Sequence, residues 1–220
     1  MYKDAELTDH LWVFEGQNVK LVGGAYTISS NSEAVISNYG KLTIESGTIK
    51  NTFESGYGVE NDNELIIKGG EISGFGGVEN CAEGIAEITG GTITGSDAAV
   101  ENYGTVKLSG APVITGGYGL IEYDDSEVIL TGALSDDASI VVNLCNWQSY
   151  KTVATGYSEG DIKYTPTESD LAKFTPYNED YIFVLDDSNN IIAVDKSVHE
   201  DKDKDGICDY CKDTMGQQLL

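Results

Sequence analysis

The sequence predicts an all-β protein, a single-stranded right-handed parallel β-helix with three short strands in each turn. Two observations carry this prediction. A block of residues recurs along the chain at a nearly constant interval, and each block contains short segments in which apolar and polar residues alternate. Alternation with a period of two is typical of strands that bury one face, and a fixed repeat of this size is typical of solenoids.

The first segment of each repeat alternates, as in Leu42-Thr43-Ile44. A glycine-containing corner such as Ser46-Gly47 follows, then a second segment, and then a third that ends in a motif such as Val59-Glu60-Asn61. Three extended segments leave no room for a helix within about 22 residues, and coiling returns the same residue to the same place every ~4.8 Å. One inward aliphatic position therefore recurs as Leu21, Ile44, Ile67, Ile88, Leu108 and Leu130.

The chain divides into four predicted parts. Residues 1–14 form an N-terminal cap strand, and residues 15–145 form about six turns of β-helix. Residues 146–195 form a capping segment, because a solenoid must cover its open end. This segment contains a short helical turn over 165–174 and a β-hairpin built from 181–185 and 191–194. Residues 196–220 form an acidic tail.

The repeat motif Asn-Tyr-Gly-x-Val/Leu-x-Leu/Ile, present at residues 38–44 and 102–108, resembles the right-handed β-helix repeats of the pectin-lyase-like fold. Such repeats occur in large secreted proteins of gut Firmicutes, and the resemblance covers about residues 15 to 145. It implies a role in adhesion, surface display or polysaccharide contact, since only some members of the wider fold are lyases or hydrolases.

Composition excludes several partners. The formal net charge is −24, from 37 acidic residues against 13 basic ones, and every basic residue is lysine. Such a charge repels nucleic acid and anionic membrane surfaces. No stretch approaches the ~20 apolar residues of a membrane span. The N-terminus has no signal-peptide pattern. We therefore expect an excised part of a longer multidomain chain, extracellular or on the cell surface.

Two polar columns are predicted on the third segment. One inward column of asparagines should form a ladder in which the side chains bond to one another and to corner backbone: Asn38, Asn61, Asn80 and Asn102. A ligand role is the alternative. An outward column of glutamates should form an acidic stripe that is solvated, collects divalent cations or faces a saccharide: Glu60, Glu79, Glu101 and Glu122.

Exposed tyrosines recur at corresponding positions of the repeats and are candidates for stacking on sugar rings. Tyr39 corresponds to Tyr103, and Tyr57 corresponds to Tyr118. The simpler interpretation is that these rings pack over loops.

An enzyme remains an alternative, because stacked glutamates could supply a catalytic pair of carboxylates. No catalytic residue is assigned. A pectate-lyase mechanism is doubtful, since lyases of this fold combine calcium-binding acids with a basic residue, typically arginine, and the chain contains none.

The tail has a metal-like spacing. Alternate acids followed by Gly206 reproduce the first half of a calcium loop, in which Asp201, Asp203, Asp205, Ile207 and Asp209 would be the ligands. Lys212 stands where an EF-hand needs glutamate, so the loop resembles the shorter loops of dockerin-like and thrombospondin type 3 repeats. Alternatives are zinc bound by His199, Cys208 and Cys211, and a solvated linker.

The sequence thus favours a non-catalytic extracellular or cell-surface module for adhesion, glycan contact or structural display. A polysaccharide-active enzyme is the first alternative and a structural spacer the second. Expected partners are a glycan or a host or cell-surface protein. The expected cofactor is calcium in the tail, with zinc as the alternative.

Overall fold

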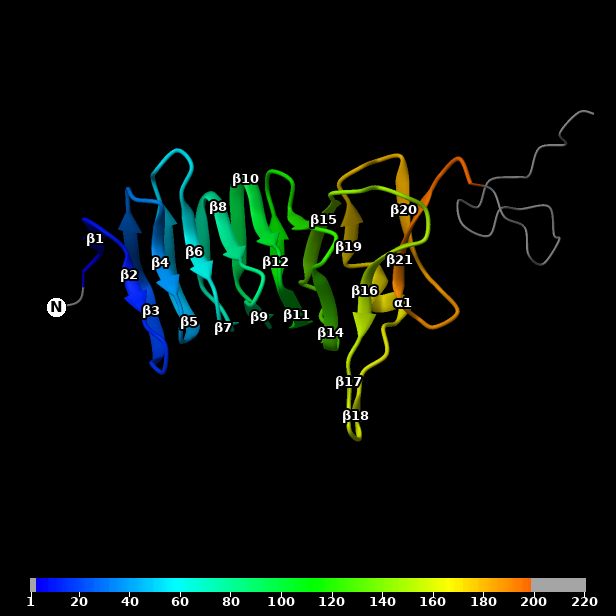
Figure 1. The fold of residues 1–220 in the computed structure, drawn as a ribbon, viewed down its shortest axis with the longest axis horizontal. Coiled ribbons are helices and arrows are strands. Elements are labelled where there is room, and N and C mark those ends of the chain that lie inside the picture. Colours follow the sequence, from blue (N-terminus) through cyan, green and yellow to red (C-terminus); the bar gives the residue numbers. More distant parts are fainter. Residues whose placement is uncertain (1–2, 199–220) are drawn as a thin grey trace, which may run out of the picture.

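The computed structural model describes residues 3–198, which form an all-β solenoid of about seven turns. Figure 1 shows the turns stacked side by side along one axis, from the N-terminal turn to the C-terminal hairpin. The predicted fold class is confirmed. Among the described residues, no helix combines the length and the apolar character needed to cross a membrane.

The strands of successive turns pair in parallel and form three faces. The first face comprises the N-terminal parts of β3 (Asn18–Ser30) and β5 (Lys41–Asn51), then β7 (Glu64–Ile67), β9 (Ile85–Ile88), β11 (Thr105–Gly110), β14 (Glu127–Leu134) and β16 (Lys151–Gly156). The second face comprises β1 (Ala5–Leu7), the C-terminal parts of β3 and β5, the N-terminal parts of β8 (Glu71–Asn80) and β10 (Thr92–Asn102), then β12 (Val113–Thr115), β15 (Ser139–Leu144) and β19 (Phe174–Pro176).

The third face carries the features that matter for function. It comprises β2 (Leu11–Val13), β4 (Ala34–Asn38), β6 (Tyr57–Asn61), the C-terminal parts of β8 and β10, then β13 (Leu120–Glu122) and the end of β15. Identical residues meet across its strands, as where Glu60 pairs with Glu79 and Asn61 with Asn80. Equivalent positions of the repeat therefore form continuous columns.

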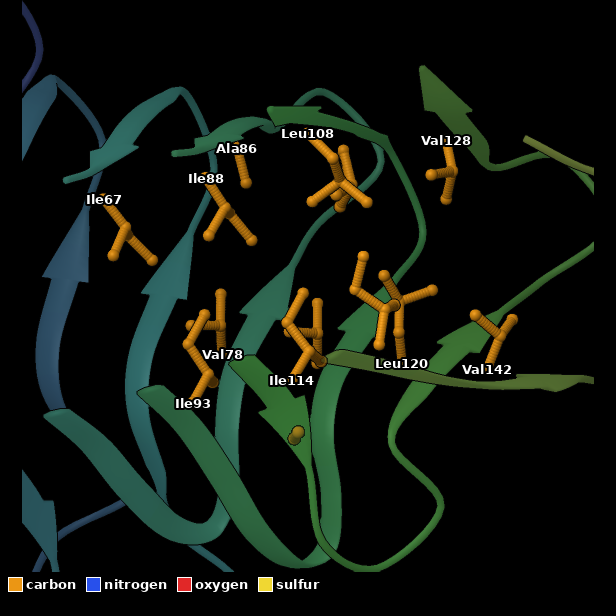
Figure 2. Close-up of a cluster of buried hydrophobic side chains, with 14 of the residues drawn as sticks. Ile67, Val78, Ala86, Ile88, Ile93, Leu108, Ile114, Leu120, Val128 and Val142 are labelled. Atoms are coloured by element: carbon orange, nitrogen blue, oxygen red, sulfur yellow. The ribbon is translucent and has the colours of Figure 1, made fainter. Parts of the chain in front are cut away.

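The core lies inside the coil. Figure 2 shows aliphatic side chains from all three faces pointing into the interior, Ile88 from the first, Ile93 from the second and Val78 from the third among them. These three side chains are fully buried. The inward aliphatic column is confirmed from Ile44 to Leu130, since each of its members pairs with the next across neighbouring strands.

Glycine makes the corner between the first and second faces. Gly47, Gly70 and Gly91 all have a positive φ, between 86° and 104°. A Cβ at Gly70 would lie 2.6 Å from the carbonyl oxygen of Gly47 in the preceding turn. The corner thus needs glycine both for its backbone conformation and for the close approach of successive turns.

The inward asparagines form the expected ladder. Nδ2 of Asn38 donates to Oδ1 of Asn61 at 2.7 Å, Asn61 donates to Asn80 at 2.8 Å, and Asn80 donates to Asn102 at 2.9 Å. The amides also reach backbone carbonyls of the next turn, as where Asn80 Nδ2 donates to the Thr105 oxygen. All four side chains are fully buried. Their polar atoms are therefore paired inside the protein, as burial requires.

The ends of the coil differ from the expected boundaries. The segment predicted as an N-terminal cap is a regular part of the coil, because β2 pairs in parallel with β4 and Leu11 lies opposite Ile36. At the other end, β16 and β19 continue the first and second faces beyond residue 145. The coil is consequently about one turn longer than the sequence suggested.

The C-terminal segment closes the coil. The hairpin lies where it was expected, with β20 (Tyr181–Leu185) antiparallel to β21 (Ile191–Asp195), which also pairs with β16. The helical turn is α1 (Glu168–Leu171), whose N-cap is Thr167. Buried Asp170 accepts bonds from Thr167 and from the amide of Leu134, so it ties α1 to the coil. A small hairpin of β17 (Ser158–Glu159) and β18 (Ile162–Lys163) projects to one side (Figure 1).

Candidate functional site

The outward column of the third face brings three of the predicted glutamates together. Ser37 of β4, Glu60 of β6, Glu79 of β8 and Glu101 of β10 are partners in consecutive strands. Ser37 donates to Glu60 Oε2 at 3.1 Å and also contacts His10 Nδ1 at 2.9 Å. Ser37 is fully buried, so this group is structural and the serine is not an accessible nucleophile.

The fourth glutamate, Glu122, does not belong to this column, so its predicted outward position is wrong. The residue opposite Glu101 is Ile121, and Glu122 lies opposite Asn102 in the inward column. A shift of one residue reverses the direction of every side chain in a strand. Glu122 is therefore 4 % exposed, and its Oε1 is buried without a hydrogen-bond partner.

Tyr57 lies across the outward surface of the third face. Its phenol donates to Glu101 Oε1 at 2.7 Å, although the two residues are two turns apart. The intervening partner of Tyr57 is Gly76, where a Cβ would lie 2.2 Å from Cε1 of the Tyr57 ring. Glycine at position 76 thus creates the space that the ring occupies. The second oxygen of Glu101 accepts from the Tyr103 phenol at 3.1 Å.

A cavity of about 410 Å³ opens beside this tyrosine. Two rings and three carboxylates contribute to its lining, which comprises Glu33, Phe53, Ser55, Tyr57, Glu60 and Glu79. Of these, Glu33 and Ser55 belong to the loops that precede β4 and β6, and Phe53 lies in the same loop as Ser55. The lining contains no lysine, so acid pairs are present here without a neighbouring base.

The carboxylate of Glu79 has an altered proton affinity. Burial, together with the charges of Glu60, Glu101 and Asp62, raises its pKa from 4.5 to about 7. A stack of like charges favours the neutral form of one member. Glu79 therefore holds a proton over part of the neutral range and can either donate or accept a hydrogen bond toward the cavity.

The predicted tyrosines separate into different surroundings. Tyr39 stacks on Trp12, with ring centroids 5.8 Å apart, and Tyr103 stacks on Tyr123 at 4.2 Å. Tyr118 contacts the edge of Tyr177 at 5.0 Å, and the residue bridged to Ala98 beyond Tyr57 and Gly76 is Gly117. That bridge is antiparallel and isolated, whereas the parallel register places Val100 opposite Leu120. The correspondence between Tyr57 and Tyr118 therefore stays a prediction.

One cluster was missed by the sequence reasoning. Glu60, Asp62 and Cys81 offer ligand atoms that all lie within 4.8 Å of one another, a set that could hold a metal ion. Burial and the neighbouring Asp62 raise the pKa of the Cys81 thiol to about 12, so a metal would have to displace its proton. The repeat could have predicted that Asp62 and Cys81 lie close together, because each follows an asparagine of the ladder and those asparagines pair in neighbouring strands.

The predicted tail sites lie outside the described residues. This holds for the calcium ligands from Asp201 to Asp209 and for the zinc alternative at His199, Cys208 and Cys211. Both assignments stay predictions from the sequence.

Comparisons with protein-family models, with curated proteins and with solved structures gave no significant match for this chain.

Proposed function

We propose that the third face is a carbohydrate-binding surface of a non-catalytic extracellular or cell-surface module, and that it binds neutral glycans. The observation that carries the proposal is the position of the Tyr57 ring on a cavity lined by the Glu60 and Glu79 carboxylates. Saccharide sites combine an apolar surface for the ring carbons with polar groups for the hydroxyls. Both components are present around this cavity.

The aromatic part of the site is held in place. The Tyr57 phenol is fixed by its bond to Glu101, and its ring lies in the space left by Gly76. A fixed ring loses little conformational freedom on binding, which favours affinity. Phe53 adds a second ring to the same lining.

The polar part of the site selects against charged polymers. Its carboxylates are acceptors for sugar hydroxyls, and the whole chain carries a formal charge of −24. Uronate or sulfated polymers would be repelled by this field, whereas neutral polysaccharides would not. The proposed ligand is accordingly an uncharged oligosaccharide.

The sequence motifs support the extracellular or cell-surface location in this proposal. They resemble pectin-lyase-like β-helix repeats of secreted proteins of gut Firmicutes, in which such repeats serve adhesion, display or polysaccharide contact. A module that contacts a glycan or a host surface protein fits that setting. A structural spacer is the outcome to be accepted if no ligand binds.

The test is calorimetric titration with cellohexaose, xylohexaose and mannohexaose, with hexagalacturonate as the charged control. We expect at least one neutral hexasaccharide to bind and hexagalacturonate not to bind. Tyr57→Leu should abolish binding, whereas Tyr118→Leu, which removes an exposed tyrosine outside this cavity, should leave binding intact. Equal affinities in both variants, or binding of hexagalacturonate alone, would refute the proposal.

A second candidate, a glycoside hydrolase, is favoured by one observation. Glu79 holds a proton at a pKa of about 7 and pairs with Glu60 in the adjacent strand, so an acid and a carboxylate lie side by side. Glycosidases use such a pair. Release of reducing ends from a bound hexasaccharide, lost in Glu79→Gln while binding persists, would support this candidate. Binding without any release supports the non-catalytic module.

A further inference from the structure

The asparagine ladder ends in a carboxylate. After Asn102, the next residue of the inward column is Glu122 of β13, followed by Leu144 of β15. Each asparagine before it donates from Nδ2 to a backbone carbonyl of the following turn, as Asn102 does to Glu127 at 3.2 Å. An ionised glutamate has no such proton to donate. Glu122 therefore breaks the bonding pattern of the column at its C-terminal end.

Glu122 lines a cavity of about 210 Å³ at this end of the ladder. The cavity lies where the pairing of the first face is short, because β14 and β16 pair through two residues each, with Ile129 opposite Thr155 and Leu130 opposite Gly156. Its lining consists of Glu122, Ser126, Glu127, Val128, Thr152, Val153 and Thr155. The unpartnered Oε1 of Glu122 belongs to a side chain that is 4 % exposed and lines this space.

The chemistry of the lining restricts what can satisfy this oxygen. The polar side chains around the cavity carry two carboxylates and three hydroxyls, and none carries a nitrogen. Lys151 precedes Thr152 of the lining, and its Nζ contacts Asp124 Oδ1 at 2.9 Å. A buried carboxylate that lacks a donor is stabilised by a proton or by a cation. The strongly negative charge of the chain raises the local concentration of cations.

We propose that this cavity binds a hard cation, with Ca²⁺ as its ligand and Glu122 as the anchoring carboxylate. Ca²⁺ takes six to eight oxygen ligands in irregular arrangements, whereas Mg²⁺ requires a regular octahedron. Glu122 supplies a buried carboxylate, and Ser126, Thr152 and Thr155 supply hydroxyls, so these side chains offer oxygen ligands only. The site is independent of the proposed glycan surface, which involves different residues, and independent of the predicted calcium loop in the tail.

The experiment is titration of the full chain with CaCl₂, with MgCl₂ in parallel, for the parent and three variants. Glu122→Gln keeps the size of the side chain and removes its charge. Thr152→Val removes a hydroxyl from an exposed position and so spares the fold. Asp203→Ala disables the predicted loop of the tail and serves as the control.

We expect Glu122→Gln to lower the Ca²⁺ stoichiometry by one equivalent, and Asp203→Ala to keep that equivalent. Thr152→Val should lower the affinity for the same Ca²⁺ equivalent about tenfold. If Glu122→Gln does not fold, the affinity of Thr152→Val tests the proposal instead. Mg²⁺ should not displace Ca²⁺ at equal concentration. Unchanged stoichiometry and affinity in Glu122→Gln, or unchanged affinity in Thr152→Val, would overturn the proposal. So would a parent protein that binds Ca²⁺ only through Asp203.

Discussion

Glu122 lies opposite Asn102 across neighbouring strands and takes the place that an asparagine holds in each of the four preceding turns. The register of the third face thus turns one acidic residue inward while its three apparent equivalents stay outward. The inward glutamate terminates the ladder, and the outward ones border the proposed glycan surface.

The first prediction concerns the stability cost of this inward carboxyl. Burial raises the pKa of Glu122 well above 4.5 in the folded protein, and the charge of Lys151 only partly opposes this shift. A raised folded pKa means that stability is highest below the pKa of the unfolded chain and falls as the pH rises through the folded pKa. The free energy of unfolding of Glu122→Gln at pH 8 should therefore exceed that of the parent by about 1–3 kcal/mol.

Urea denaturation at pH 4 and pH 8, in the presence of EDTA, measures this effect. The matched control is Glu71→Gln, which changes an exposed acid at the start of β8 and should alter stability little at either pH. If the difference between Glu122→Gln and the parent is the same at both pH values, the inward position of Glu122 is wrong.

The second prediction concerns the ladder itself. Asn80→Ala removes the bonds to Asn61, to Asn102 and to backbone carbonyls at the centre of the column. Because buried partners are left unpaired, the free energy of unfolding should fall by about 2–4 kcal/mol. Asn63→Ala, which removes a single exposed bond to the Tyr39 carbonyl, should cost less than about 0.5 kcal/mol. Denaturant titration compares the two, and equal costs would contradict the account.

The columns of the repeat could be predicted because each turn places the same residue over the last. The shift of the register by one residue at Glu122 was not predicted from the repeat. Leu120 and Ile121 are both aliphatic, so either can occupy the inward position of Val100, and the motif Ile121-Glu122-Tyr123 looked like Val100-Glu101-Asn102. The pairing resolves this choice, since Leu120 lies opposite Val100.

The candidate site was less predictable than the coil. The outward glutamates follow from the repeat, but the bond from Tyr57 to Glu101 spans two turns and depends on the small residue at Gly76. No local pattern encodes a contact of that kind. The extension of the coil at its N-terminus could not be seen in the sequence, because Trp12 and Val13 stand at the positions where later turns have glutamate and asparagine.

The third prediction concerns Glu79, whose pKa is raised to about 7. Its contribution to stability is fully present below about pH 4.5 and is lost as the pH rises through 7, because the charged form is penalised only in the folded state. Glu79→Gln should remove this loss, which we expect to be on the order of 1 kcal/mol after allowing for solvent screening.

Thermal unfolding of Glu79→Gln and of the parent between pH 4 and pH 8 checks this prediction. The control is Glu87→Gln, which alters an outward acid of the first face. Its profile of thermal unfolding against pH should run parallel to that of the parent. A Glu79→Gln profile that also runs parallel to the parent would show that Glu79 has an ordinary carboxyl.

The fourth prediction concerns the space over Gly76. A Cβ at this position would meet the Tyr57 ring at 2.2 Å, so Gly76→Ala should displace the ring and break its bond to Glu101. Affinity for the neutral hexasaccharide that binds the parent should fall about tenfold. Gly132→Ala, where the nearest atom to an added Cβ is 3.4 Å away, should bind like the parent. Circular dichroism shows whether both variants keep their strands.

The most direct test of the central claim, that the third face is a glycan surface, is amide chemical-shift mapping during titration with a neutral hexasaccharide. We predict that the perturbed amides cluster in residues 53–62, 76–81 and 98–103, in the neighbouring strands β6, β8 and β10 and in the loop before β6. Perturbation confined to the first face, or no perturbation with any of the three neutral hexasaccharides, would contradict the account.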